Sequence, residues 1–127
     1  LRAEVLPLAD EDATAYAGVL AAYRLPKDDA GRGERIRDAL ERACEVPLRI
    51  AEGAAEVAML AADLAARGNP NLRGDAATAV HLAVAAVRSA TCLVLINAEL
   101  GDLGPKPVER ADDLMAIADV AAERLTG

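Results

Sequence analysis

Apolar residues recur every three or four positions along most of the chain, a spacing that places them on one face of an α-helix. Four segments show this pattern, and we expect helices over residues 10–24, 33–67, 75–100 and 108–125. Pro47 falls inside the second segment, where we expect it to kink the helix or divide it into two. Short connections favour antiparallel neighbours, so the predicted fold is all-α, an up-and-down bundle of four or five helices.

The helix expected over residues 75–100 is apolar on nearly every side. Arg88 and Asn97 interrupt its apolar run, and no basic cluster follows it, unlike the flanks of a membrane span. We therefore expect a buried central helix of the bundle and no membrane association.

Composition agrees with a single helical domain over residues 1–127, of which 54 % are hydrophobic. About a quarter of the residues are alanine, the best helix former, while Phe and Trp are absent. A net charge of −7 without aromatic platforms argues against nucleic-acid binding. One histidine and two cysteines without paired spacing do not supply a metal site. Unpaired cysteines fit a reducing compartment, so we expect a cytoplasmic location.

Asp12 and Tyr16 are four residues apart, so their side chains share one face of the first predicted helix. They are candidates for a polar site, although a first-turn acid and a half-buried tyrosine explain the same spacing. Arg24 and Lys27 lie at the end of that helix, close to further arginines in residues 32–37. In an acidic chain this basic group suits an anionic ligand tail, although nearby acids partly cancel it and a solvated loop is the alternative.

Asn69 and Asp75 belong to the turn between the second and third predicted helices. Asp75 fits an N-cap or a first-turn acid, and an amide with a carboxylate at a helix N-terminus also forms a polar recognition corner. Asn97 is an amide within an apolar run, and a buried amide needs hydrogen-bond partners from the backbone or a neighbouring helix.

Helix geometry separates these candidates along the bundle. Asp75 and Asn97 are 22 positions apart on one helix, about 33 Å, so one chain does not place both in one site. With antiparallel neighbours, Asp12, Tyr16 and Asn97 fall near one level, and the Asn69 turn near the opposite end. Either the chain has two polar corners, or an antiparallel homodimer brings them together.

The order of these motifs resembles that of the cyclodeaminase/cyclohydrolase family. This family includes the C-terminal domain of formiminotransferase-cyclodeaminase and methenyltetrahydrofolate cyclohydrolase. The resemblance covers most of the chain and rests on Asp12-x-x-Ala-Tyr16, Leu25-Pro26-Lys27, Arg35-x₃-Ala39, Val46-Pro47-Leu48, Gly68-Asn69-Pro70-Asn71-Leu72-x-x-Asp75 and Ile96-Asn97.

The resemblance implies an all-helical homodimer that acts on one-carbon units of tetrahydrofolate without a metal or redox cofactor. A cyclodeaminase closes the methenyl bridge with loss of ammonia, and a cyclohydrolase opens it with water. Both reactions need proton transfer at a nitrogen, which a carboxylate, a tyrosine or a lysine can perform. The residues expected to be catalytic are Asp12, Tyr16 and Lys27. Those expected to bind the substrate are Arg24, Asn69, Asp75 and Asn97.

The chain departs from the family pattern in two respects. The family has a glycine-rich segment ahead of the Asp12 motif, and we expect the domain to lack it. Gly74 stands where the family often has serine, and Leu93 and Leu95 stand where it often has asparagine and arginine. The two leucines remove hydrogen bonding and charge. They favour an alternative, a non-catalytic helical homodimer that binds folate or serves as an interaction module.

Overall fold

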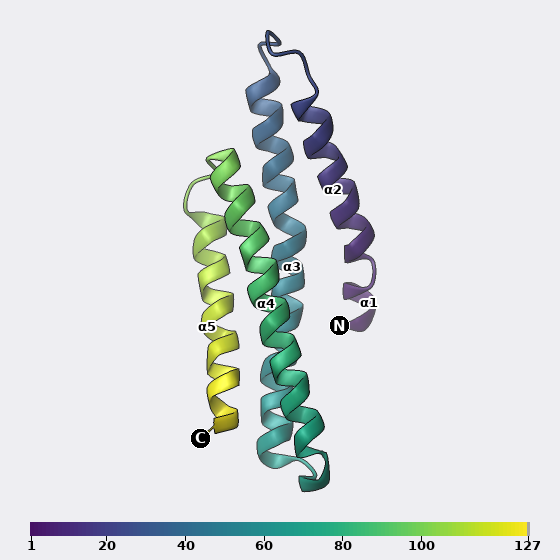
Figure 1. The fold of residues 1–127 in the computed structure, drawn as a ribbon, viewed down its shortest axis with the longest axis vertical. Helices are drawn as coiled ribbons and strands as arrows, with labels where there is room; N and C mark the ends of the chain where they lie inside the picture. The colour runs from purple at the N-terminus through teal and green to yellow at the C-terminus, as the bar shows by residue number, and fades with distance from the viewer. Residues whose placement is uncertain (127) are drawn as a thin grey trace.

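All regular structure in residues 1–126, the part of the chain that the computed structural model describes, is helical (Figure 1). The elements in chain order are α1 (Arg2–Val5), α2 (Leu8–Tyr23), α3 (Arg32–Arg67), the 3₁₀ turn η1 (Pro70–Leu72), α4 (Arg73–Gly101) and α5 (Lys106–Thr126). The long helices α2, α3, α4 and α5 alternate in direction (Figure 1). The predicted all-α up-and-down bundle is therefore confirmed.

The four long helices begin and end within two residues of the predicted bounds. The sequence pattern did not predict α1 and η1, which are single turns without buried residues. The division of the second helix was also a wrong expectation, because α3 runs through Pro47 without interruption. Gly68 ends α3 as expected, since a Cβ atom there would overlap the carbonyl of Leu64.

The core lies between α3, α4 and α5 and consists mainly of alanine and valine. Small side chains let the helix backbones approach closely, which an alanine-rich sequence favours. In residues 1–126, α2 packs against α3 and makes no close backbone contact with α4 or α5. A smaller apolar cluster around Val19 and Leu40 holds α2 in place.

One face of α4 is open, although α3 and α5 pack against the rest of it. Val80, Val87 and Val94 are fully buried, whereas Leu82 and Leu100 are 68 % and 60 % exposed. The expectation of a buried central helix is therefore wrong for this face. Within residues 1–126, the segment Pro70–Gly101 is also the one helix long and apolar enough to span a membrane by length and composition. Its packing against two neighbours is that of a bundle helix.

Candidate functional site

The first group of candidates lies at the middle of α2. Asp12 is half-buried and Tyr16 is 61 % exposed. Among residues 1–126, neither side chain forms a hydrogen bond or an ion pair. Glu11, the neighbour of Asp12, pairs with Arg49 and so fixes the level of α2 along α3. The carboxylate and the phenol are thus open to a ligand from one flank of α2.

Asn97 connects α4 to the proline-containing turn of α3. Its Nδ2 donates a hydrogen bond to the carbonyl oxygen of Ala43 at 3.1 Å. Pro47 has no N–H group, so the Ala43 carbonyl four residues earlier has no donor from its own helix. Asn97 supplies the missing donor, which explains how α3 continues through Pro47. The expected partner for this amide is therefore a backbone carbonyl of the neighbouring helix.

These two contacts place the first group and Asn97 at neighbouring levels. Arg49 and Ala43 are six residues apart on α3, about 9 Å along its axis. The helices α2 and α3 run antiparallel (Figure 1). Tyr16, four residues after Asp12, therefore lies about one turn closer to the Ala43 level. Asp12, Tyr16 and Asn97 therefore lie near one level along the bundle, as the spacing predicted, although α2 makes no close backbone contact with α4 in residues 1–126.

The second group, Arg24 and Lys27, lies in the connection between α2 and α3 at one end of the bundle, and both side chains are exposed. Arg32 closes this connection, because its Nε donates to the carbonyl of Leu25 and its Nη2 to that of Tyr23, each at 3.1 Å. Its guanidinium also stacks 5.9 Å from the Tyr23 ring centre. Arg32 is thus a structural residue, whereas Arg24 and Lys27 face solvent.

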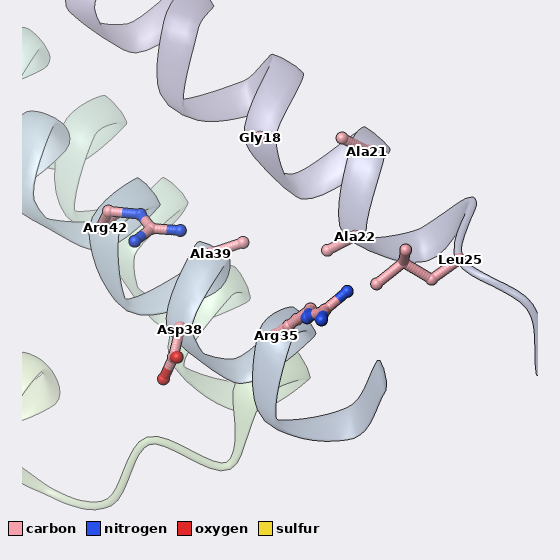
Figure 2. A pocket seen from close by; sticks show the side chains of 8 residues that line it. All are labelled: Gly18, Ala21, Ala22, Leu25, Arg35, Asp38, Ala39 and Arg42. Carbon is pink, nitrogen blue, oxygen red and sulfur yellow. The ribbon is translucent and has the colours of Figure 1, made fainter. Parts of the chain in front are cut away.

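A groove of about 280 Å³ separates α2 from α3 beside this connection (Figure 2). Arg35 and Arg42 extend from α3 toward α2, while Asp38 points away from the gap (Figure 2). Arg42 was not among the residues expected from the sequence, although its spacing of seven from Arg35 places both on one helix face. Tyr16, two positions before Gly18 of the groove, points about 160° away from it around α2. The groove and the Asp12–Tyr16 pair therefore lie on different sides of α2.

The third group lies at the opposite end of the bundle, where α3 turns into α4 (Figure 1). Asn69 caps η1, and its Oδ1 accepts a hydrogen bond from the backbone N–H of Asn71 at 3.0 Å. Asp75 is an exposed acid in the first turn of α4, whose N-cap is Leu72. Since α3 has 36 residues and is about 54 Å long, this corner is far from Lys27.

Comparison with known proteins identifies the family. The model of the formiminotransferase-cyclodeaminase family matches residues 1–102. This chain belongs to that family. The membership confirms the resemblance drawn from the order of the motifs.

Two curated members of the formiminotransferase-cyclodeaminase family show how far the similarity extends. Methenyltetrahydrofolate cyclohydrolase of Methylorubrum extorquens is 35 % identical over an alignment of 132 positions, which covers 98 % of this chain and 64 % of the relative. Formimidoyltransferase-cyclodeaminase of Rattus norvegicus is 32 % identical over 99 residues, which cover 75 % of this chain and 18 % of the relative. The chain thus spans less than two thirds of the length of these relatives.

Proposed function

We propose that this chain acts on a tetrahydrofolate one-carbon derivative, as a methenyltetrahydrofolate cyclohydrolase or a formimidoyltetrahydrofolate cyclodeaminase. The observation that carries the proposal is the similarity, over 98 % of the chain, to a relative named methenyltetrahydrofolate cyclohydrolase. The rat relative supports the cyclodeaminase reaction over a shorter stretch. The proposed assembly is a cytoplasmic homodimer of single helical domains, with the folate derivative as substrate and no further cofactor.

Three residues are proposed to move protons in this reaction: Asp12, Tyr16 and Lys27. In the cyclohydrolase reaction, water oxygen bonds to the methenyl carbon and one carbon–nitrogen bond breaks. One water proton ends on the released nitrogen and the other goes to solvent. The exposed phenol of Tyr16 and the unpaired carboxylate of Asp12 suit such an exchange, because no internal partner holds either group among residues 1–126.

Four residues are proposed to bind the substrate: Arg24, Asn69, Asp75 and Asn97. Arg24, with Lys27 nearby, offers cations to the glutamate tail of folate. Arg35 and Arg42 of the adjoining groove add two guanidinium groups on the side of α3 that faces α2 (Figure 2). Asn97 already donates to Ala43, so its proposed contact with substrate uses its remaining amide hydrogen or its oxygen.

The alternative, a family member without turnover, is favoured by the surface around Leu93 and Leu95. These side chains are 48 % and 37 % exposed, and they give an apolar surface where the family pattern has polar groups. In this alternative the protein is a homodimer that binds folate or serves as an interaction module, and it does not open the methenyl bridge.

The test is a spectroscopic assay with 5,10-methenyltetrahydrofolate and with 5-formiminotetrahydrofolate. We expect the protein to accelerate loss of the methenyl absorbance, or to generate it from the formimino compound. Asp12→Asn should abolish this activity and leave thermal stability nearly unchanged, while Asp10→Asn on the same helix should retain it. An unchanged absorbance with both compounds, on folded protein, would contradict the enzymatic proposal and support the alternative.

Lys27→Ala tests the proposed contact with the glutamate tail separately. We expect about tenfold weaker binding of a tetrahydrofolate derivative, the loss of roughly one charge-assisted hydrogen bond. Titration calorimetry on wild type and Lys27→Ala measures it. Equal dissociation constants would contradict the proposed contact between Lys27 and the glutamate tail.

A further inference from the structure

The open face of α4 carries small and apolar side chains at a regular spacing. We call this face the α4 seam, and its residues are Leu82, Ala86, Ser89, Leu93, Ile96 and Leu100. The steps between them are four, three, four, three and four residues, the spacing by which two helices pack along a shared seam. The four large side chains of the seam are 48–68 % exposed, so nothing within residues 1–126 covers them.

An apolar groove continues the α4 seam toward α3. It has a volume of about 400 Å³ and is lined almost entirely by carbon, with Gly53, Val57, Ala79 and Leu82 among its residues. Small side chains at its base leave room for the ridge of another helix. The seam and the groove together form a continuous apolar patch, whereas the surface of an ordinary monomer exposes mostly single, scattered apolar side chains.

Charge decides among the possible partners of this surface. Between residues 76 and 98, α4 carries one full charge, Arg88, and Asp119 of α5 already pairs with it at 2.9 Å. Glu99, between Ile96 and Leu100, is the one exposed acid within the span of the seam, so a strongly basic partner finds little charge to bind, and a membrane surface finds no cluster of lysine or arginine beside it. The chain as a whole has a net charge of −7, so two copies repel each other on most other faces. The stretch of the seam from Leu82 to Ile96 carries no unpaired charge, so two copies meet there without like-charge repulsion.

We propose that the α4 seam binds the same seam of a second copy, with the two α4 helices antiparallel and the twofold axis between Ala86 and Ser89. The inference rests on the homodimer of the proposed function and deepens it by naming the face and the register. Small residues at the centre let the two helices approach closely. In this register Leu82 packs against the partner's Leu93, and the larger side chains close both ends of the contact.

The same register brings the separated candidate residues together. Asp75 is level with the partner's Leu100, so the partner's Asn97 is three positions away, about 4.5 Å along the axis. Within one copy Asp75 and Asn97 are about 33 Å apart. Each of the two sites in the proposed dimer then takes its α3–α4 corner from one copy and the level of Asp12, Tyr16 and Asn97 from the other.

Sedimentation velocity tests the interface without reference to folate. We expect a dimer for the wild type at micromolar concentration and a monomer for Leu93→Asp, which puts a charge in the seam. The matched control is Val120→Asp on α5, where the side chain is 45 % exposed and outside the seam, and this variant should remain a dimer. A monomeric wild type, or a Leu93→Asp dimer as tight as wild type, would overturn the proposal.

Cross-linking tests the register on folded protein even if Leu93→Asp fails to fold. In a Cys92→Ser background, Ser89→Cys places one thiol beside the twofold axis, while Asp112→Cys places one on an exposed position of α5. We expect a short bis-maleimide to join most Ser89→Cys chains into dimers and few Asp112→Cys chains. Equal cross-linking of the two, or binding of the wild type to phosphatidylcholine vesicles in place of self-association, would contradict the proposal.

Mixing of variants tests the shared site. Tyr16→Phe and Asp75→Asn are each expected to lose most activity in the methenyl assay. After mixing and subunit exchange, half of the dimers are hybrids with one intact site, so about a quarter of wild-type activity should return. Failure to recover activity, with the Ser89→Cys cross-link still formed, would overturn the shared site and leave the interface standing. Inactive wild type with an intact cross-link would instead contradict the proposed function.

Discussion

The two faces of α4 have nearly the same chemistry and very different surroundings. Val80, Val87 and Val94 on the covered face have no exposed surface, because α3 and α5 pack against them. On the open face Leu82 and Leu93 are 68 % and 48 % exposed. The apolar side chains of a helix favour burial against other helices. Which face of α4 is covered within the chain depends on where α3 and α5 pack against it.

The border between the two faces is marked by Asn97. Its amide satisfies the Ala43 carbonyl that Pro47 leaves without a donor, so a polar side chain is retained in an otherwise apolar helix for a structural reason. The covered face is thus fixed by packing and by this hydrogen bond. The open face has no such constraint within residues 1–126 and is free to serve a second copy.

The largest predicted difference comes from placing a charge on each face in turn. Val87→Asp should lower the free energy of unfolding by about 4 kcal/mol or prevent folding, because it buries a carboxylate without a partner. Leu82→Asp should change it by less than about 1 kcal/mol in the monomer, because the side chain is exposed. Urea denaturation of both variants measures the contrast at a concentration where both are monomeric. Similar losses would show that both faces of α4 are covered.

A smaller effect is expected from Cys44, which packs with Val94 on the covered face. Burial, and then the nearby Glu41 and Glu45, raise the pKa of its thiol from 9.0 to about 11. Between pH 9 and pH 11 the thiol is ionised in the unfolded chain and still protonated in the folded one. The free energy of unfolding therefore falls by roughly 2–3 kcal/mol as the pH rises from 9 to 11. Below pH 9 both states hold the proton and the contribution is fully present.

Cys44→Ala should remove this part of the alkaline decline, and Cys92→Ala, at an exposed cysteine, should not. Unfolding free energies of the three proteins at pH 8 and pH 11 make the comparison. An equally steep decline in Cys44→Ala and wild type would show that the thiol is hydrated in the folded state.

The smallest effect is expected at the border of the two faces. Asn97→Leu should cost about 1–2 kcal/mol, because it leaves the Ala43 carbonyl without a donor. In a Pro47→Ala background the new backbone N–H supplies that donor, so the same change should cost much less. A double-mutant cycle by urea denaturation measures this coupling. Additive effects would show that Asn97 and Pro47 act independently.

Most of the fold was predictable because local signals mark where each helix ends. Gly68 and the prolines around Lys106 stop or start helices by backbone chemistry alone, which explains agreement to within two residues. The openness of α4 was not predictable, since an apolar residue on every side gives no periodicity that distinguishes a covered face from an open one. The continuity of α3 was missed because the donor for Ala43 comes from Asn97, 54 positions away in the sequence.

The candidate site was predictable to a smaller extent. Counting residues along antiparallel helices placed Asp12, Tyr16 and Asn97 near one level and Asp75 at the far end, because the helical rise is constant. The groove with Arg42 depends on which face of α3 meets α2, and the engagement of Arg32 depends on the path of the connection. Both are tertiary features that spacing in the sequence does not contain.

The distance between two copies of one label tests the α4 seam most directly. In a Cys92→Ser background, spin labels at Ser89→Cys should give a short distance, near the lower limit of pulsed electron resonance. Labels at Glu99→Cys should be separated by about 35 Å along the antiparallel helices. Short distances at both positions would indicate parallel helices, and the absence of any dipolar signal would indicate a monomer; either result would contradict the proposed pairing.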